Sequence, residues 1–231
     1  MSVRIQAPSE TSIWMNSRSV FDLYRQRARN EEVEMTCAAQ AATLLDGISS
    51  RGQVVLDVGC GSGWFVHSLR SRGLDLEYWG VDATESFVSL AHSELAAYGI
   101  PNERVLHGRI EDLGGSVDHV VCMNVLTNID NWHRPLDRMC EIAGDSIILR
   151  ESFGETSQYS LVIDRFLDGA LPLKVHVNTY CREEFVQFLM QRGFACEFVV
   201  DERTEGRPEQ VIGYPHHWEF LIARRQQGGR E

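Results

Sequence analysis

The chain has 231 residues, of which 43% are hydrophobic and 24% are charged. This length suits one domain with a sizeable core or two small domains, and the composition excludes disordered and fibrous proteins. With 22 Lys and Arg against 33 Asp and Glu, the formal charge is −11. Such a surface repels phosphate backbones and anionic membrane leaflets, so nucleic acid and membranes are disfavoured as partners.

The sequence shows neither the pattern of an export signal nor a metal-binding motif. No apolar run is long enough to span a membrane, and residues 1–10 lack the apolar core of a signal peptide. The six cysteines are scattered and form no Cys-x-x-Cys pair, and no histidines are spaced to bind metal from one helix. We therefore expect a cytoplasmic protein with free thiols and no metal site.

The first fifty residues have a helical pattern. Ala38, Ala41, Leu45 and Ile48 recur at helical spacing, which favours a helix that covers one face of a sheet. An alternative is that this region forms a lid over a ligand, for which the aromatic candidates are Trp14, Phe21 and Tyr24.

From residue 53 onward, short apolar runs alternate with helical patterns. The expected strands are 54–58, 78–81, 105–108, 119–123, 146–150, 196–200 and 218–223. The expected helices are 64–72, a helix with Thr84 as its N-cap, 134–143, and 180–192 with Thr179 as its N-cap. This alternation predicts an α/β fold with a parallel sheet and helices on both of its faces.

The strongest local signal is VVLDVGCGSGWF, residues 54–65, in which Gly59, Gly61 and Gly63 follow a buried strand. Glycine is required where a tight turn needs positive φ or where the backbone touches a ligand. The turn should leave free N–H groups at the start of the following helix for a polar or anionic ligand group. Trp64 stands where the dinucleotide-binding motif G-x-G-x-x-G requires glycine, which argues against a nicotinamide or flavin dinucleotide.

LDVGCGSG, residues 56–63, resembles the first motif of class I S-adenosylmethionine-dependent methyltransferases. The resemblance covers about residues 50–150 by motif and reaches residue 224 by the order of elements. It implies a Rossmann-like seven-stranded sheet, mostly parallel with the last strand antiparallel. It also implies S-adenosylmethionine as the cofactor and S-adenosylhomocysteine as the product.

The resemblance also implies which residues bind the cofactor. Asp82, at the end of the second strand, lies where an acid hydrogen-bonds the ribose, although a helix N-terminal acid is the alternative. The segments 107–113 and 122–124 lie where the family binds adenine and the methionine part. The expected set is Asp57, Gly59, Cys60, Gly61, Gly63, Asp82, Ala83, Arg109, Ile110, Glu111, Met123 and Asn124.

Methyl transfer requires alignment of the acceptor and exclusion of water, with a base where a proton must leave. The candidate proton acceptors follow expected strands or lie in the insert, and each has a structural role as its alternative: His133, His176, His216, His217 and Glu151. The insert 152–178 is the expected substrate lid, in which Tyr159, Phe166 and Leu171 either line a pocket or pack on the sheet.

The sequence thus predicts a single methyltransferase domain, as a monomer or homodimer, that acts on oxygen or nitrogen of a small molecule. Its expected parts are a helical cap (1–50), a cofactor-binding half (51–151), the insert (152–178), a C-terminal helix and hairpin (179–224) and a flexible tail (225–231). The alternatives are a nicotinamide-dependent oxidoreductase and a cofactor-binding scaffold without catalysis.

Overall fold

The computed structural model describes residues 17–164 and 173–226. Trp14, Phe166, Leu171 and residues 227–231 of the expected tail lie outside these ranges. The centre of the fold is an eight-stranded sheet with the order β3-β2-β1-β4-β5-β12-β9, and β8 pairs with β5 off this path. The strands are β1 (Val54–Val58), β2 (Glu77–Asp82), β3 (Val105–His107), β4 (Val117–Met123), β5 (Ala143–Gly154), β8 (Tyr180–Cys181), β9 (Phe194–Val200) and β12 (Trp218–Arg225).

The direction of the strands confirms the predicted Rossmann-like architecture. Strands β1 to β5 pair in parallel, whereas β12 runs antiparallel to both β5 and β9. The chain runs from β1 outward through β2 to β3 and then crosses back to β4 on the other side of β1, which places the carboxyl ends of β1, β2 and β4 at one edge. In open α/β sheets, ligands bind at this edge, next to the point where the strand order reverses.

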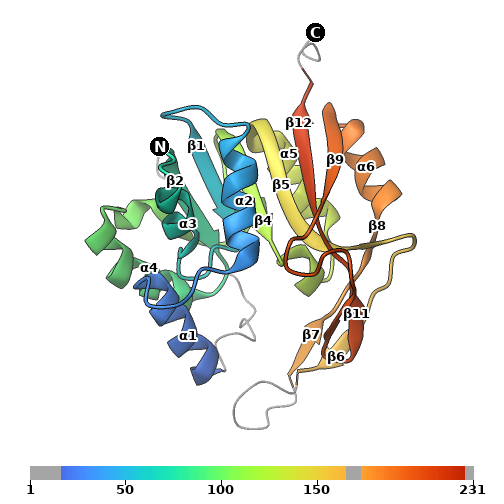
Figure 1. Ribbon diagram of the computed structural model, residues 1–231, viewed down its shortest axis with the longest axis horizontal. Helices are drawn as coiled ribbons and strands as arrows, with labels where there is room; N and C mark the ends of the chain where they lie inside the picture. Colours follow the sequence, from blue (N-terminus) through green and yellow to red (C-terminus); the bar gives the residue numbers. More distant parts are fainter. Residues whose placement is uncertain (1–16, 165–172, 227–231) are drawn as a thin grey trace.

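Helices cover both faces of the sheet, as Figure 1 shows. Helices α2, α3 and α4 pack on one face, and α5 and α6 on the other. The helices are α1 (Arg18–Ala28), α2 (Thr36–Asp46), α3 (Phe65–Ser71), α4 (Glu85–Leu95), α5 (His133–Ile142) and α6 (Arg182–Met190). Short 3₁₀ turns are η2 (Ala96–Tyr98), η3 (Asn102–Arg104), η4 (Ile110–Asp112) and η5 (Leu126–Asn128).

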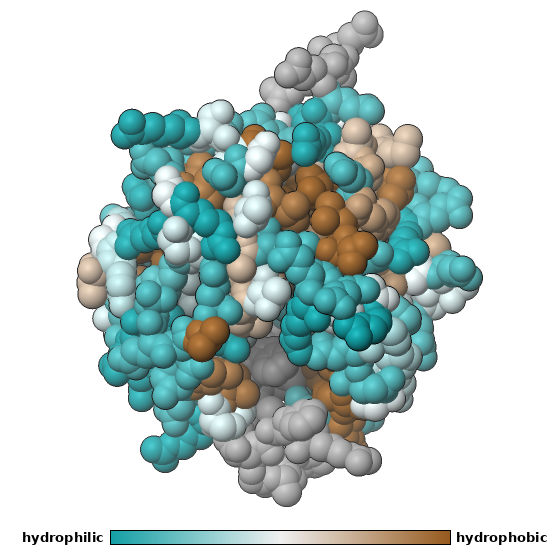
Figure 2. Space-filling model, viewed as in Figure 1, coloured by the Kyte–Doolittle hydropathy of each residue, from teal (hydrophilic) through white to brown (hydrophobic). Residues whose placement is uncertain are grey.

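The central strands carry apolar residues on both of their faces because helices bury both faces. Val120 and Val121 of β4, and Ile147 and Ile148 of β5, alternate between the two hydrophobic cores and are fully buried. On the face shown in Figure 2, hydrophobic residues gather beside α2 around β12 and β9, where no described helix covers the sheet. None of the described helices is long and apolar enough to cross a membrane.

Several element boundaries differ from those predicted. Residues 180–181 form β8 instead of the first turn of a helix, because Phe153 and Gly154 offer them a free strand to pair with. Helix α6 therefore begins at Arg182 with Cys181 as its N-cap, and the prediction of Thr179 as the cap is wrong. The fifth strand is longer than residues 146–150, since β12 pairs with it as far as Ser152. Arg225, expected in the tail, belongs to β12.

Two hairpins extend the carboxyl edge of the sheet and were not predicted. One joins β6 (Leu161–Ile163) to β7 (Lys174–His176), within the expected insert. The other joins β10 (Glu209–Val211) to β11 (Tyr214–His216), between β9 and β12. In Figure 1, β7 lies on one side of this edge and α1 on the other. The insert is therefore partly a β-hairpin.

Candidate functional site

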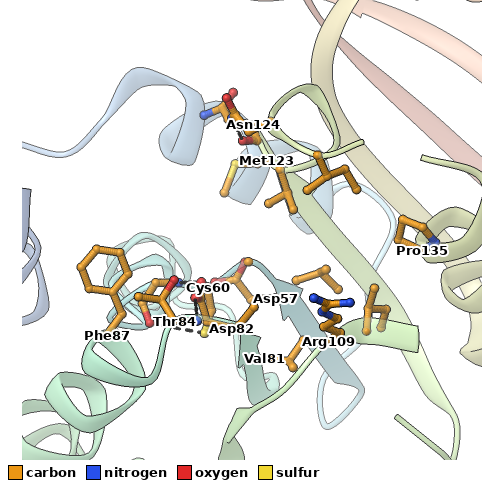
Figure 3. Close-up of a pocket in the computed structure, with 18 of the residues that line it drawn as sticks. Asp57, Cys60, Val81, Asp82, Thr84, Phe87, Arg109, Met123, Asn124 and Pro135 are labelled. Carbon is orange, nitrogen blue, oxygen red and sulfur yellow. Dashed lines mark hydrogen bonds between the residues drawn. The ribbon is translucent and has the colours of Figure 1, made fainter. Parts of the chain in front are cut away.

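A cavity of about 750 Å³ opens at the carboxyl ends of β1, β2 and β4. This volume lies in the range of roughly 300–1,000 Å³ that is usual for small-molecule sites. Its wall comes from α1, the glycine loop, the segments after β2, β3 and β4, the start of α5, and β7. In Figure 3, Met123 and Asn124 lie at the top of the view, Asp57 and Asp82 lie below them, and Arg109 lies to the right of these two carboxylates.

The glycine loop has the backbone conformation that the sequence predicts. Gly59 and Gly61 have φ values of 71° and 55°, which disfavour residues with a Cβ atom. A Cβ at Gly59 would lie 2.2 Å from Cγ2 of Val125, and one at Gly61 would lie 2.4 Å from Cε1 of Tyr24. Val125 and Tyr24 also line the cavity. Glycine at positions 59 and 61 therefore allows these two side chains to pack directly on the loop backbone at the cavity wall.

The first three N–H groups of this loop are already hydrogen-bonded within the protein. The N–H groups of Gly59 and Cys60 both donate to the carbonyl oxygen of Val81, at 2.8 and 3.1 Å. The N–H of Gly61 donates to the carboxylate of Asp82 at 2.8 Å. These three hydrogen bonds fix the loop to the end of β2. The three N–H groups therefore stabilise the loop conformation and are not available to bind an anion.

Asp82 ends β2 and lies on the cavity wall. Its Oδ2 accepts from Gly61 N–H, and its Oδ1 accepts from Thr84 N–H at 2.7 Å. Burial raises the pKa of this carboxyl above its ordinary value, while the two N–H groups act in the opposite direction. The Thr84 side chain also donates to this carboxyl. A carboxylate has about four acceptor positions, so it can still accept a hydrogen bond from a ribose hydroxyl.

Asp57 is the buried fourth residue of β1 and lines the same cavity. Its Oδ2 accepts a hydrogen bond from the hydroxyl of Tyr78 at 2.9 Å. Burial raises the pKa of Asp57 to about 7, since the Tyr78 hydrogen bond offsets only part of the lost hydration. A cationic ligand in the cavity would favour the ionised form.

Helix α1 brings an aromatic wall to the cavity. Tyr24 stacks on Phe87 with ring centroids 4.4 Å apart and an angle of 3° between the planes. Arg27 lies over the ring of Trp64, 5.7 Å from its centroid. Burial raises the pKa of Tyr24 to about 12, so its hydroxyl stays protonated. Of the aromatic lid candidates, Tyr24 lies on the cavity wall, whereas Phe21 does not.

Most of the expected cofactor-binding residues converge on this cavity. Those on its wall are Asp57, Gly59, Cys60, Gly61, Asp82, Ala83, Arg109, Ile110, Glu111, Met123 and Asn124. Gly63 is not on the wall, and a Cβ there would lie 2.4 Å from Cδ1 of Leu95 in α4. Gly63 therefore permits close packing of two helical segments behind the site. The individual binding roles stay predictions.

The five candidate proton acceptors do not converge. His176 on β7 lines the cavity, whereas the other four lie outside its wall. His133 is exposed and stacks on Trp132, with ring centroids 3.7 Å apart. His216 is buried beside Trp218, and His217 is exposed next to it.

Glu151 is fully buried and supports the loop after β4. Its Oε1 accepts from the N–H groups of Val125 and Leu126, each at 3.0 Å. Its Oε2 accepts from the N–H and the hydroxyl of Thr127. Burial raises the pKa of Glu151 to about 7, against the effect of these donors. The carboxylate thus caps η5 and holds Val125 against the glycine loop.

Several wall residues have no motif that would have identified them. They are Arg27, Asn128, Asp130, Asn131, Arg134 and Lys174. Their common signal is position, since most of them follow β4 or lie in the insert, at the carboxyl edge. Within residues 17–164 and 173–226, no group of three or more His, Cys, Asp or Glu side chains is placed to hold a metal ion.

Comparison with known proteins agrees with this geometry. Residues 55–143 match the family model of a methyltransferase domain, which spans β1 to the start of β5. The chain is similar to magnesium protoporphyrin IX methyltransferase (ChlM) from Synechocystis PCC 6803 with bound S-adenosylhomocysteine, at 18% identity and a TM-score of 0.61. That match covers 92% of this chain and 96% of ChlM.

Two further structures share the fold. The CcbJ methyltransferase from Streptomyces caelestis is 13% identical with a TM-score of 0.62, over 94% of this chain and 99% of CcbJ. An S-adenosylmethionine-dependent methyltransferase from Clostridium acetobutylicum is 13% identical with a TM-score of 0.59, over 90% of this chain and 98% of that one.

Proposed function

We propose, from the premise that residues 55–143 match a methyltransferase domain and that the chain shares the fold of S-adenosylmethionine-dependent methyltransferases, that the enzyme methylates an oxygen or nitrogen atom of a small-molecule acceptor. The observation that carries the proposal is the two-ended cavity. One end holds Asp82 and the glycine loop, and the other holds His176 with residues 128–131. ChlM, which shares the fold, is named for a small-molecule acceptor, and this supports the same class here.

The wall fits the cofactor by its chemistry. Asp82 offers carboxylate oxygens to a ribose diol, and the glycine loop allows close approach of a ligand to the backbone. Ile110, which is almost fully buried in η4, offers an apolar surface to the adenine ring. Asp57 offers an anionic group to the cationic part of the molecule. When bound, S-adenosylmethionine supplies a methyl group activated by its sulfonium.

The protein's own contribution is alignment, exclusion of water and removal of a proton. Tyr24 and Phe87 close one side of the cavity, and β7 closes the other. As an acceptor hydroxyl or amine is methylated, it loses its proton, which the imidazole of His176 accepts. His176 takes this role because it is the candidate that the fold brings to the cavity wall.

The two alternatives have less support. A nicotinamide cofactor would require a glycine where Trp64 stands, and Trp64 is packed under Arg27 on the cavity wall. A scaffold that binds the cofactor without catalysis would release no S-adenosylhomocysteine with any acceptor.

The test is a panel of small-molecule hydroxy and amino compounds, with release of S-adenosylhomocysteine as the readout. We expect His176→Ala to lower kcat about 10²-fold or more with an acceptor that the enzyme accepts, in line with loss of a general base. The matched control is His217→Ala, an exposed histidine off the cavity wall. An equal loss of kcat in both variants, or an unchanged kcat in His176→Ala, would show that His176 is not the proton acceptor. If none of the compounds leads to release of S-adenosylhomocysteine, the proposal of a small-molecule acceptor is contradicted.

A further inference from the structure

Lys174 is the single lysine of this chain, beside 21 arginines. It lies on β7, and its side chain is exposed while it also forms part of the cavity wall. His176 is two positions further along the same strand, so both side chains leave the same face of the hairpin. Val175 between them is buried and also lines the cavity. The only ammonium of the side chains therefore stands next to the proposed proton acceptor.

Hydrogen bonds fix β7 over the loop that follows β4. Just after β7, the N–H of Asn178 donates to the carbonyl oxygen of Thr127 at 3.0 Å. The side-chain amide of Asn178 donates to the carbonyl oxygen of Ile129 at 2.8 Å. Asn178 is fully buried, so this junction is firm. Lys174 thus belongs to the end of the cavity that lies beside residues 128–131, away from the glycine loop.

The charges at this end of the cavity are unusual for so acidic a chain. Most described arginines form ion pairs with Asp or Glu. Within residues 17–164 and 173–226, neither Lys174 nor Arg134 forms an ion pair, and both line the cavity. Asp130 is the one acid among the wall residues from 124 to 134 and from 174 to 176. These wall segments therefore carry a net positive charge within a protein whose formal charge is −11.

We propose that the acceptor carries an anionic group, a carboxylate or a phosphate, and that the ammonium of Lys174 binds it with Arg134 as a second cation. This inference rests on the proposed function, because it names the acceptor class for the same site. A chain of charge −11 repels anions at long range, so binding one requires local cations without competing acidic partners. The same cations disfavour a positively charged acceptor.

The single lysine makes the site directly measurable. An N-hydroxysuccinimide ester of acetic acid acylates amines and leaves arginine unmodified, so the Lys174 ammonium and the chain's α-amino group are the two amines to follow by peptide mass. The protein is saturated with S-adenosylhomocysteine and acetylated with benzoate, phenyl phosphate or neutral benzamide present at equal ionic strength.

We expect at least one of benzoate and phenyl phosphate to slow acetylation of Lys174 severalfold relative to the α-amino group, while benzamide has no effect. The anion that protects at the lower concentration identifies the source, carboxylate or phosphate. Lys174→Gln should weaken binding of that anion by about tenfold or more, as expected for loss of a charged hydrogen bond. Lys174→Arg should keep most of the affinity, and the affinity for S-adenosylhomocysteine should not change in either variant.

The control is Arg51→Gln, which changes the net charge equally. Arg51 is 88% exposed and precedes β1, at the edge of the sheet opposite the cavity. Unprotected Lys174 with both anions, or equal anion affinity in the wild type and Lys174→Gln, would overturn the anionic acceptor even if neutral compounds are methylated. Protection of Lys174 without methylation of any compound would instead overturn the proposed function and leave the anion site standing.

Discussion

The carboxylate of Asp82 accepts a hydrogen bond from the N–H of Gly61 at 2.8 Å, across 21 residues of sequence. The same carboxylate accepts from Thr84 N–H, so one side chain fixes both the glycine loop and the start of α4. An acid at this position therefore organises the site before any ligand arrives, and it faces the cavity with its remaining lone pairs.

The first prediction concerns this carboxylate. Asp82→Ala should weaken S-adenosylhomocysteine binding by about 1–3 kcal/mol, because the loop N–H groups and the ribose hydroxyls both lose their acceptor. Isothermal titration calorimetry measures the change. Asp75→Ala is the control, since Asp75 precedes β2 at the opposite edge and is largely exposed. Unchanged affinity in Asp82→Ala would take Asp82 out of the cofactor site.

The second prediction separates close contact from backbone conformation in the glycine loop. Gly61 and Gly73 both have positive φ, 55° and 70°, but a Cβ at Gly73 would meet nothing within 4 Å, whereas one at Gly61 would collide with Tyr24. Both Ala variants should lose about 1 kcal/mol of stability from the left-handed backbone. Only Gly61→Ala should also lose cofactor affinity, as judged by calorimetry beside urea unfolding. Equal affinity in the two variants would show that contact with α1 does not shape the site.

The third prediction is a pH dependence. Burial raises the pKa of Asp57 to about 7 in the free protein, and a cationic ligand in the cavity lowers it by favouring the carboxylate. A ligand that prefers the deprotonated form binds more tightly as pH rises through the pKa of the free protein. Affinity for S-adenosylmethionine should therefore rise severalfold from about pH 6 to about pH 8.

Asp57→Asn is the control for this rise, because it leaves titration of the ligand itself unchanged. The difference between the two proteins isolates the carboxyl of Asp57. Parallel pH profiles for wild type and Asp57→Asn would exclude proton release from Asp57 on binding.

The fourth prediction concerns the buried ion pair of Arg150 and Asp201, which joins β5 to the loop after β9 at 2.7 Å. Arg150 also donates to Asn124 on the cavity wall, and its Nη2 has no hydrogen-bond partner among the described residues. Asp201→Ala leaves a buried cation without its counter-charge and should cost about 3–5 kcal/mol of unfolding free energy in urea. Asp22→Ala, which breaks exposed pairs within α1, should change stability little.

The residues that sequence alone could identify are those whose role follows from backbone geometry. The glycines after β1 and the acid after β2 lie at fixed offsets from apolar strands, so the pattern predicted both the strand-loop-helix unit and the place of Asp82. The alternation of strands and helices likewise predicted the sheet, because a parallel pair requires a crossover that covers one of its faces.

The acceptor end was decided by tertiary structure. His176 and Lys174 reach the cavity because Asn178 binds the loop after β4, some 50 residues earlier in the chain. The tertiary structure also buries Glu151, which caps η5, and it places His133, His216 and His217 outside the cavity wall. Local spacing predicts a turn or a strand, but contacts between segments distant in sequence depend on how loops of unspecified length pack. The amino-acid order therefore determined the glycine loop and the acid after β2, and only packing selected the side chains at the proposed acceptor end.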